Sequence, residues 1–272
     1  MSLSSSDLNE LSAAILDISV RAGQEVLAVY GAGFDVYTKS DATPVTDADR
    51  RSEQLILDAL TRLVTEIPVV AEESYAEGRI PEVGDSPFFL VDPLDGTKEF
   101  VSRNGEFTVN IALIKDHRPV LGVVRVPVLQ KTYIGCEGHG AEVRDNDGAV
   151  REIQVSAASR TPPCVVGSRS HRGASLDAYL DKLGDYDLVP MGSSLKFCVV
   201  AEGTADVYPR LGPTSEWDTA AAQAVVEQAG GSVVKLDGKP LSYNAKEDIL
   251  NPWFIVIGAA DVDWLALLPD GE

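Results

Sequence analysis

Between residues 68 and 155 the chain carries six short segments rich in β-branched and aromatic residues, separated by Gly, Pro, Asp or Asn. Such segments favour β-strands, and the residues between them favour tight turns, so neighbouring strands are expected to pair as hairpins. This spacing predicts a largely antiparallel sheet in the first half of the protein. The expected strands cover residues 68–71, 88–91, 107–114, 120–128, 131–137 and 151–155.

Helices are predicted on either side of this strand-rich region. Apolar residues recur at steps of three and four from Leu8 to Val26 and again from Ile56 to Leu63, which is the spacing of one buried helix face. The second helix is expected over residues 47–63, with acidic residues in its first turn. Further along, strands and helices alternate: strands are expected at 164–167, 205–208 and 254–257, and helices at 174–183, 194–202, 218–229 and 262–268.

These elements predict a protein of mixed class, α+β in its first half and α/β in its second. A length of 272 residues suits one large domain or two smaller ones that share an interface. A soft boundary is expected near residues 156–163. Residues 1–157 would then form an α+β domain with a largely antiparallel sheet, and residues 158–272 would form an α/β domain.

Carboxylates stand where several of these elements begin or end. Each one alone has a structural explanation, as a helix cap, a solvated loop residue or part of a type I turn. Together they place acidic groups over the end of a sheet, where ligands usually bind in folds of this type. They follow two of the expected strands and begin two of the expected helices: Glu72, Asp92, Asp95, Asp47 and Asp218.

Clustered carboxylates repel one another and need a compensating cation. Because no Cys or His accompanies them, the oxygen donors favour a hard ion such as Mg²⁺ over zinc. Asp92 and Asp95 would reach two ions about 4 Å apart, as two-metal phosphoryl sites require, and the Leu94 carbonyl would face a metal. The turn at Gly96 and Thr97 would hold a phosphate on its N–H groups, with the Thr97 hydroxyl orienting a water nucleophile.

The order Asp92-Pro-Leu-Asp-Gly-Thr disfavours two other classes of protein. Phosphatases of the haloacid-dehalogenase type also end a strand on aspartates before Gly-Thr, but with one residue between the acids, whereas Pro93 and Leu94 make two here. An EF-hand calcium loop alternates its acidic positions and ends in a distal Glu. A purely structural acidic protein is consistent with the spacing alone.

The formal net charge of −19 and the pI of about 4.5 restrict the partners of this protein. They disfavour nucleic acid and anionic membranes, but not a small phosphorylated substrate, because a bound cation reverses the local field. No apolar run is long enough to span a membrane, and no signal peptide is visible. Cys136, Cys164 and Cys198 show no C-x-x-C spacing and are expected to be reduced, which favours a cytoplasmic location.

Three separated motifs resemble, in order, those of the inositol monophosphatase superfamily of Mg²⁺-dependent, lithium-sensitive phosphatases. The resemblance covers essentially the whole chain, from Thr43-Pro-Val-Thr-Asp onward. The motifs are Ala71-Glu-Glu-Ser, Asp92-Pro-Leu-Asp-Gly-Thr and Glu216-Trp-Asp-Thr-Ala-Ala.

Within the superfamily, four further stretches are similar to the bacterial 3'(2'),5'-bisphosphate nucleotidase branch, which belongs to sulfate assimilation. Inositol-type members usually carry Thr-Asn-Phe where this chain has Lys98-Glu-Phe. The stretches are Lys98-Glu-Phe, Arg103-Asn-Gly-Glu-Phe-Thr-Val-Asn, Gly192-Ser-Ser-Leu-Lys-Phe-Cys and Tyr208-Pro-Arg-Leu-Gly-Pro-Thr.

The resemblance implies a layered α-β-α-β-α fold that binds two or three Mg²⁺ ions. The implied metal ligands are the side chains of Glu72, Asp92, Asp95 and Asp218 and the carbonyl of Leu94, so the second domain completes a site that lies mostly in the first. Asp47 and Thr97 are the implied pair that orients and deprotonates the attacking water. The implied substrate contacts are Gly96, Thr97, Lys98, His171, Ser193, Ser194, Lys196 and Arg210.

The implied reaction is hydrolysis of adenosine 3',5'-bisphosphate to AMP and phosphate by direct attack of water, with 3'-phosphoadenylylsulfate as a possible second substrate. Cationic contacts would suit the second phosphate. His171 and Lys196 also have plain alternatives, as a surface-loop histidine and a lysine on a solvated helix face. Two other functions remain open: an inositol or related sugar phosphatase on the same scaffold, and a metal-dependent protein that binds a phosphorylated metabolite. A homodimer is common in the superfamily.

Overall fold

The computed structural model of the protein describes residues 4–38, 44–169 and 173–268. The two longest helices that it describes open on capping boxes, one of Ser4 with Asp7 and one of Thr46 with Asp49, which satisfy the first free N–H groups of each helix. The helices are α1 (Ser5–Ala32), α2 (Asp47–Leu63), α3 (Glu72–Ala76), α4 (Thr97–Val101), α5 (Ala174–Leu183), α6 (Leu195–Ala201), α7 (Ala220–Gln228) and the 3₁₀ helix η1 (Trp264–Leu267).

The first half of the protein forms a seven-stranded sheet with strand order β3-β4-β5-β6-β7-β8-β9. Strand β3 pairs parallel with β4, and every other pair is antiparallel, which confirms the largely antiparallel sheet. Strand β8 was not predicted, because its sequence is half polar. The strands are β3 (Val69–Ala71), β4 (Phe88–Asp95), β5 (Thr108–Lys115), β6 (Arg118–Val126), β7 (Lys131–Cys136), β8 (Gly140–Asp145) and β9 (Val150–Glu152).

The second half forms a five-stranded sheet with strand order β11-β10-β12-β14-β13. Strand β10 pairs parallel with both of its neighbours, and the other two pairs are antiparallel. The strands are β10 (Cys164–Ser168), β11 (Asp187–Met191), β12 (Val207–Arg210), β13 (Ser232–Lys235) and β14 (Phe254–Ile257), and a separate ribbon pairs β1 (Val36–Thr38) with β2 (Pro44–Thr46).

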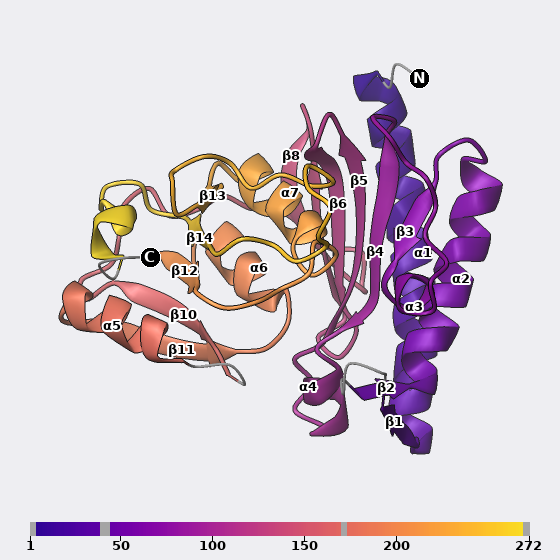
Figure 1. The fold of residues 1–272 in the computed structure, drawn as a ribbon, viewed down its shortest axis with the longest axis horizontal. Helices are drawn as coiled ribbons and strands as arrows, with labels where there is room; N and C mark the ends of the chain where they lie inside the picture. The colour runs from indigo at the N-terminus through magenta and orange to yellow at the C-terminus, as the bar shows by residue number, and fades with distance from the viewer. Residues whose placement is uncertain (1–3, 39–43, 170–172, 269–272) are drawn as a thin grey trace.

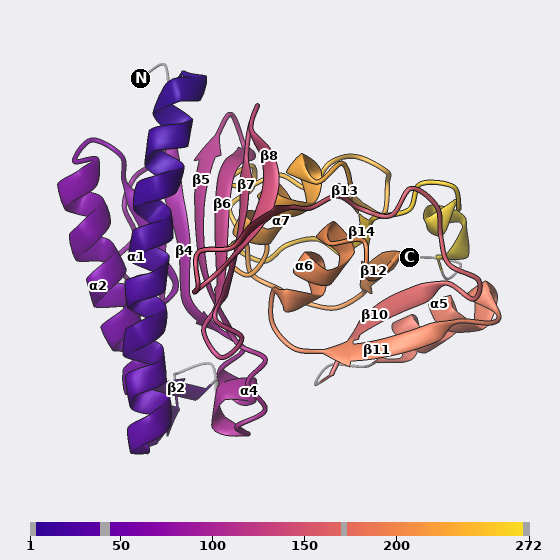
Figure 2. The same cartoon turned by 180° about the vertical axis from the view of Figure 1, so that it is seen from behind.

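The helices and sheets stack in five layers (Figure 1). Helices α1 and α2 pack on one face of the seven-stranded sheet through an apolar cluster that includes Ile15, Ile56 and Phe89. Helices α6 and α7 fill the space between the two sheets, and α5 with η1 covers the outer face of the second sheet. The same order is seen from behind in Figure 2. The layered α-β-α-β-α fold is therefore confirmed.

Helix α7 approaches the first sheet unusually closely. A Cβ atom at Gly122 of β6 would lie 2.1 Å from the Ala221 carbonyl oxygen, and one at Gly135 of β7 would lie 2.4 Å from the Ala224 carbonyl oxygen. Only glycine leaves room for the helix backbone at these two positions. The second half of the chain is thus packed directly against the sheet of the first half. None of the helices in the described residues is long and apolar enough to cross a membrane.

Two details of these elements differ from the sequence prediction. Strand β4 does not end before Asp92 but runs on to Asp95, with a shift of register between Asp92 and Asp95 against β5. Pro93 cannot donate to the ladder, and a bulge accommodates it without ending the strand. Leu63, predicted to lie on the buried face of α2, is 42% exposed, because the core contacts of that helix end at Leu60.

Candidate active site

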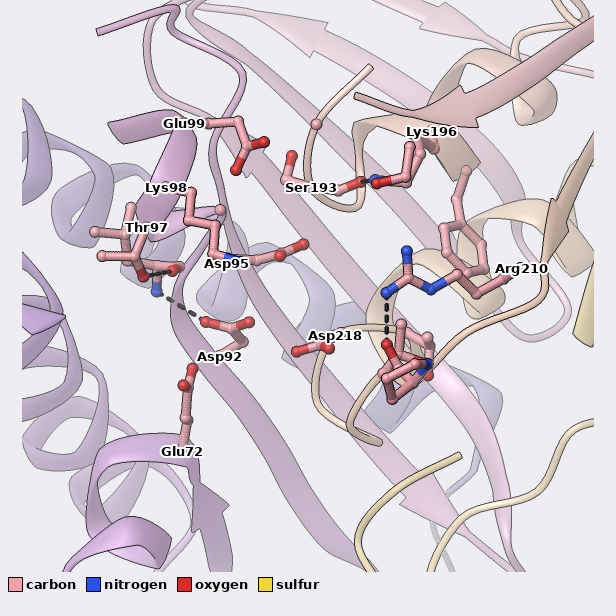
Figure 3. A pocket seen from close by; sticks show the side chains of 18 of the residues that line it. Glu72, Asp92, Asp95, Thr97, Lys98, Glu99, Ser193, Lys196, Arg210 and Asp218 are labelled. Atoms are coloured by element: carbon pink, nitrogen blue, oxygen red, sulfur yellow. Dashed lines mark hydrogen bonds between the residues drawn. The ribbon is translucent and has the colours of Figure 1, made fainter. Parts of the chain in front are cut away.

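The carboxylates of Asp92, Asp95 and Asp218 meet at the end of strand β4. Each offers an oxygen atom, and the three atoms lie within 4.8 Å of one another. Glu72 extends toward them from the start of α3, and Figure 3 shows the four carboxylates turned toward a common space. A cavity of about 250 Å³ opens beside them. Four carboxylates predicted as metal ligands are therefore brought together.

The bulge in β4 is what brings two of these carboxylates to one side of the strand. In a regular strand, residues three apart point to opposite faces, whereas the extra residue of a bulge restores the same face. The Leu94 N–H donates to Asp92 Oδ1 at 3.0 Å, and the Ser52 hydroxyl donates to the Pro93 carbonyl at 2.8 Å. The bulge is therefore held from α2 as well as from within.

Ser194 forms hydrogen bonds to both Asp95 and Asp218, which lie in different halves of the protein. Its backbone N–H and its hydroxyl lie 2.6 and 2.7 Å from Asp95 Oδ2, and the same hydroxyl lies 2.6 Å from the Asp218 carbonyl oxygen. The Asn110 amide adds a hydrogen bond to the Ser194 hydroxyl at 2.8 Å. Ser194 is buried and does not line the cavity, so it lies behind the carboxylates, and its predicted contact with a substrate stays a prediction.

The segment that carries Glu72 is held by Glu53 of α2, a residue that the sequence analysis did not single out. Glu53 Oε2 accepts the N–H of Glu73, and Glu53 Oε1 accepts both the N–H and the hydroxyl of Ser74, at 2.7 to 2.8 Å. These N–H groups are free donors at the start of α3, so a buried carboxylate satisfies them. Glu53 thereby fixes the point from which Glu72 reaches the cavity.

The site favours protonated carboxyl groups unless a cation is present. Burial, and then the charges of Glu72, Asp95 and Asp218, raise the pKa of Asp92 well above its usual range. Burial and the charge of Asp95 raise the pKa of Asp218 to about 7, and burial also raises the pKa of Asp95. Charges of one sign held this close disfavour the ionised state.

A divalent cation fits this donor set. The donors are carboxylate oxygens, Leu94 also lines the cavity, and no Cys or His lines it among the described residues. Hard cations prefer such an all-oxygen set, and a cation would lower the pKa values that burial raises. The residues in place therefore suit Mg²⁺ or a similar ion.

The structure does not bring Asp47 to the site. Asp47 is the first residue of α2 and is exposed, and it does not line the cavity. Asp49, two residues later, is 1% exposed, and its Oδ1 accepts the Thr97 hydroxyl at 3.3 Å. Asp49 therefore occupies the place beside Thr97 that the sequence analysis gave to Asp47.

A cationic wall faces the carboxylates across the cavity. Lys196 is 6% exposed, which excludes a solvated helix face, and burial lowers its pKa to about 8. Its ammonium donates to the Ser193 carbonyl at 2.6 Å and lies over the Tyr208 ring at 5.5 Å. Arg210 donates to the Pro213 carbonyl, and its buried Nε has no hydrogen-bond partner among the described residues. Figure 3 shows both cations on the side of the cavity opposite Glu72.

The remaining predicted contacts lie at the cavity edge, with one exception. Gly96, Thr97, Lys98 and Ser193 all line the cavity. Gly96 has a φ of +91° and directly precedes α4, so the predicted turn into a helix is present. His171 lies outside the described residues.

The fold and the site define a class of protein: a layered α-β-α-β-α protein in which an all-oxygen acidic cluster faces the cations of Lys196 and Arg210 across one cavity. The model of the inositol monophosphatase family matches residues 7–257 of the chain. The protein belongs to the inositol monophosphatase family.

Individual relatives agree with this membership. The chain is 46% identical over 244 residues to the 3'(2'),5'-bisphosphate nucleotidase CysQ of Escherichia coli, a match that covers 89% of this chain and 97% of that protein. It is 37% identical to the nucleotidase CysQ of Aggregatibacter actinomycetemcomitans, covering 92% and 93% of the two chains.

Solved structures of relatives have the same fold. CysQ from Bacteroides thetaiotaomicron superimposes with a TM-score of 0.77 at 40% identity, covering 92% of this chain and 97% of that one. The extragenic suppressor protein suhB from Bartonella henselae superimposes with a TM-score of 0.78 at 25% identity, covering 97% and 100%.

Proposed function

We propose that this protein is a Mg²⁺-dependent 3'(2'),5'-bisphosphate nucleotidase that hydrolyses adenosine 3',5'-bisphosphate to AMP and phosphate, with 3'-phosphoadenylylsulfate as a second substrate. The observation that carries the proposal is one cavity with carboxylates on one side and the cations of Lys196 and Arg210 on the other. A substrate with two phosphates needs both sides. The carboxylates would hold metal ions beside the reacting phosphate, and the side-chain cations would bind the second phosphate directly. The CysQ relatives, which are 3'(2'),5'-bisphosphate nucleotidases, support this choice of substrate.

The proposed metal ligands are the carboxylates of Glu72, Asp92, Asp95 and Asp218 and the carbonyl of Leu94. Bound Mg²⁺ would supply charge that polarises the phosphate, lowers the pKa of a water and stabilises the leaving oxygen. Two or three ions are proposed, since four carboxylates carry more negative charge than one divalent ion offsets.

The residues proposed to orient and deprotonate the water are Thr97 and Asp49. The Thr97 hydroxyl donates its proton toward Asp49 Oδ1, so its oxygen lone pairs are free to accept from a water in the cavity. Asp49 is buried, and it also accepts hydrogen bonds from the N–H and hydroxyl of Thr46 at 2.7 and 2.8 Å, which fix its carboxylate. A positioned carboxylate within reach of the nucleophile is what general-base catalysis requires.

The second phosphate is proposed to bind at Lys196 and Arg210, with Ser193 at the same wall. Lys196 carries a positive charge near neutral pH even though burial lowers its pKa to about 8. The buried Nε of Arg210 offers a donor that the described residues leave unused. A phosphate here would accept charge-assisted hydrogen bonds from both side chains.

Two further expectations belong to this proposal. A cytoplasmic location is supported by Cys136, Cys164 and Cys198, all of which are buried and free. A homodimer stays a prediction, which sedimentation analysis would check.

A substrate panel tests the proposal. Phosphate release is measured from adenosine 3',5'-bisphosphate, 3'-phosphoadenylylsulfate and inositol 1-phosphate, each with and without Mg²⁺. We expect the bisphosphate to be the best substrate and activity to require the metal. Equal or faster turnover of the inositol ester would contradict the nucleotide assignment, and tight metal-dependent binding without turnover would indicate a binding protein.

A further inference from the structure

An ion pair joins the two halves of the protein beside the cavity. Glu106 lies just before β5, and Arg169 directly follows β10. The Arg169 guanidinium donates twice, from Nε to Glu106 Oε2 at 2.9 Å and from Nη2 to Glu106 Oε1 at 2.7 Å. This two-point geometry fixes both the distance and the angle between the side chains.

The same pair also binds the last two residues of β11 and the first residue of the turn that follows it. Glu106 Oε2 accepts the N–H of Gly192 at 2.8 Å, and Arg169 Nη2 donates to the Pro190 carbonyl at 2.7 Å. The Arg169 N–H adds a bond to the Met191 carbonyl at 3.1 Å. Residues 190–192 are therefore held by three hydrogen bonds from the two partners.

This turn is closely packed against the first half of the protein. A Cβ atom at Gly192 would lie 2.5 Å from Glu99 Cγ and 2.9 Å from the Glu106 carbonyl oxygen, so the two backbones are nearly in contact. Ser193, the next residue, has a φ of +48°, an uncommon conformation for a residue with a side chain. The Ser193 carbonyl accepts a hydrogen bond from the Lys196 ammonium. A shift of the turn would therefore move the cation at the cavity wall.

We propose that Glu106 and Arg169 are positioning residues that set the place of the Gly192–Ser193 turn and of Lys196, and thereby the preference of the cavity for a substrate with two phosphates over a small phosphate monoester. This inference rests on the proposed function and adds to it a pair that lies outside the cavity. Neither Glu106 nor Arg169 lines the cavity.

A surface ion pair usually contributes little, so the proposal needs a matched control. Arg118 and Glu227 form such a pair, with an N···O distance of 2.6 Å and side chains 45% and 17% exposed. The Arg169 and Glu106 side chains are 43% and 21% exposed. The control pair joins β6 to α7 and does not line the cavity. It therefore differs from the Glu106–Arg169 pair in its location but hardly in the exposure of its side chains.

The experiment measures kcat and KM for adenosine 3',5'-bisphosphate and for p-nitrophenyl phosphate at saturating Mg²⁺. For Arg169→Gln we expect the KM for the bisphosphate to rise about tenfold, the loss typical of a charge-assisted contact, with kcat nearly unchanged. The monoester should be turned over as by the unsubstituted protein. Arg169→Lys should recover part of the loss, and Arg118→Gln should change neither substrate.

Binding of the bisphosphate, measured by calorimetry in an Asp49→Asn background, gives a readout that does not depend on turnover. An affinity that Arg169→Gln leaves unchanged would overturn the positioning role, and so would an equal loss on both substrates. Failure of the unsubstituted protein to hydrolyse the bisphosphate would instead overturn the proposed function. The two failures are therefore distinguishable.

Discussion

Asp47 and Asp49 are two positions apart on α2 and have opposite environments. Asp47 is exposed at the first helical position, whereas Asp49 is buried and bonded to Thr46 and Thr97. Residues on the buried face of a helix recur at steps of three and four, and Asp49 shares that face with Glu53 and Ile56. The motif Thr46-x-x-Asp49, a capping box, was the sequence signal that could have identified the buried carboxylate.

Substitution of the two aspartates separates these environments. We expect Asp49→Asn to lower kcat by about 100-fold or more, because a general base contributes a factor of that size. Asp47→Asn should leave kcat unchanged and serves as the matched control. Steady-state kinetics with melting curves for both variants makes the comparison. The reverse result, a large loss of kcat in Asp47→Asn alone, would support the prediction from sequence that Asp47 orients and deprotonates the water.

The pKa of Asp218 predicts how the metal-free protein responds to pH. Burial and the charge of Asp95 raise this pKa from 3.8 to about 7, so the folded chain keeps the proton to higher pH than the unfolded chain does. The stabilising contribution is complete below the unfolded value and is lost as the pH rises through the folded one. In EDTA, we expect the melting temperature to fall between pH 4 and 7 by about 2–4 °C per kcal/mol lost.

Asp218→Asn and Mg²⁺ provide the controls for this pH effect. The variant should show a shallower fall, because its amide does not titrate. Mg²⁺ should raise the melting temperature most above pH 7, since the ion binds ionised carboxylates. Identical pH profiles for the variant and the unsubstituted protein would contradict this account of Asp218.

Among the elements of the fold, the turn before α6 contributes to the acidic cluster through Ser194. This serine connects the end of β4 to the segment before α7, by its bonds to Asp95 and to the Asp218 carbonyl. Groups that orient metal ligands typically change metal affinity by about 10- to 100-fold when they are removed. The turn therefore supports the proposed metal site, although it carries none of the proposed ligands.

Ser194→Ala should weaken Mg²⁺ binding by about 10- to 100-fold and destabilise the fold by about 1–3 kcal/mol, because buried partners lose their hydrogen bonds. Ser19→Ala is the matched control, since Ser19 is fully buried on α1 and, within the described residues, its hydroxyl bonds only to the Leu16 carbonyl. Mg²⁺ titration of activity compares the two. If both variants bind Mg²⁺ equally well, Ser194 has no role in the site.

The elements also show which parts of the fold the sequence predicts. Helices α2 and α5 have their predicted bounds, because their apolar spacing and end residues agree. Strands β11 and β13 were missed, since β11 contains Pro190 and β13 is short and half-buried. The continuation of β4 through Pro93 was missed as well, because a bulge depends on pairing with β5 and not on local sequence. Residue types thus predicted the carboxylate cluster, and tertiary contacts decided its exact members.

At the scale of the whole molecule, the site depends on how closely the two halves pack. Helix α7 lies on the first sheet over Gly122 and Gly135, and Asp218 stands two residues before that helix. The position of Asp218 relative to Asp92 is therefore set by the distance between helix and sheet. The division of the chain at residues 157 and 158 stays a prediction.

Gly122→Ala tests this dependence. The added Cβ would lie 2.1 Å from the Ala221 carbonyl oxygen, so α7 must move, and we expect a destabilisation of about 3 kcal/mol with loss of activity. Gly31→Ala on α1 is the control: apart from its chain neighbours and the backbone of its own helix, no atom of the described residues lies within 4 Å of its Cβ position, and alanine should stabilise the helix by about 0.5 kcal/mol. Denaturant unfolding measures both. Unchanged stability in Gly122→Ala would contradict the close packing.

The proposed function requires that the carboxylates around Asp92 hold the Mg²⁺ needed for phosphate release. The most direct test follows phosphate release from adenosine 3',5'-bisphosphate against Mg²⁺ concentration for the unsubstituted protein and Asp92→Asn. Since metal ions supply several kcal/mol to such reactions, we expect the variant to lose about 1000-fold in rate. Its metal-free melting temperature should be unchanged or higher, because the amide, unlike the carboxyl group it replaces, cannot ionise in a crowded acidic site. Near-normal, Mg²⁺-dependent turnover by a folded Asp92→Asn would contradict the claim.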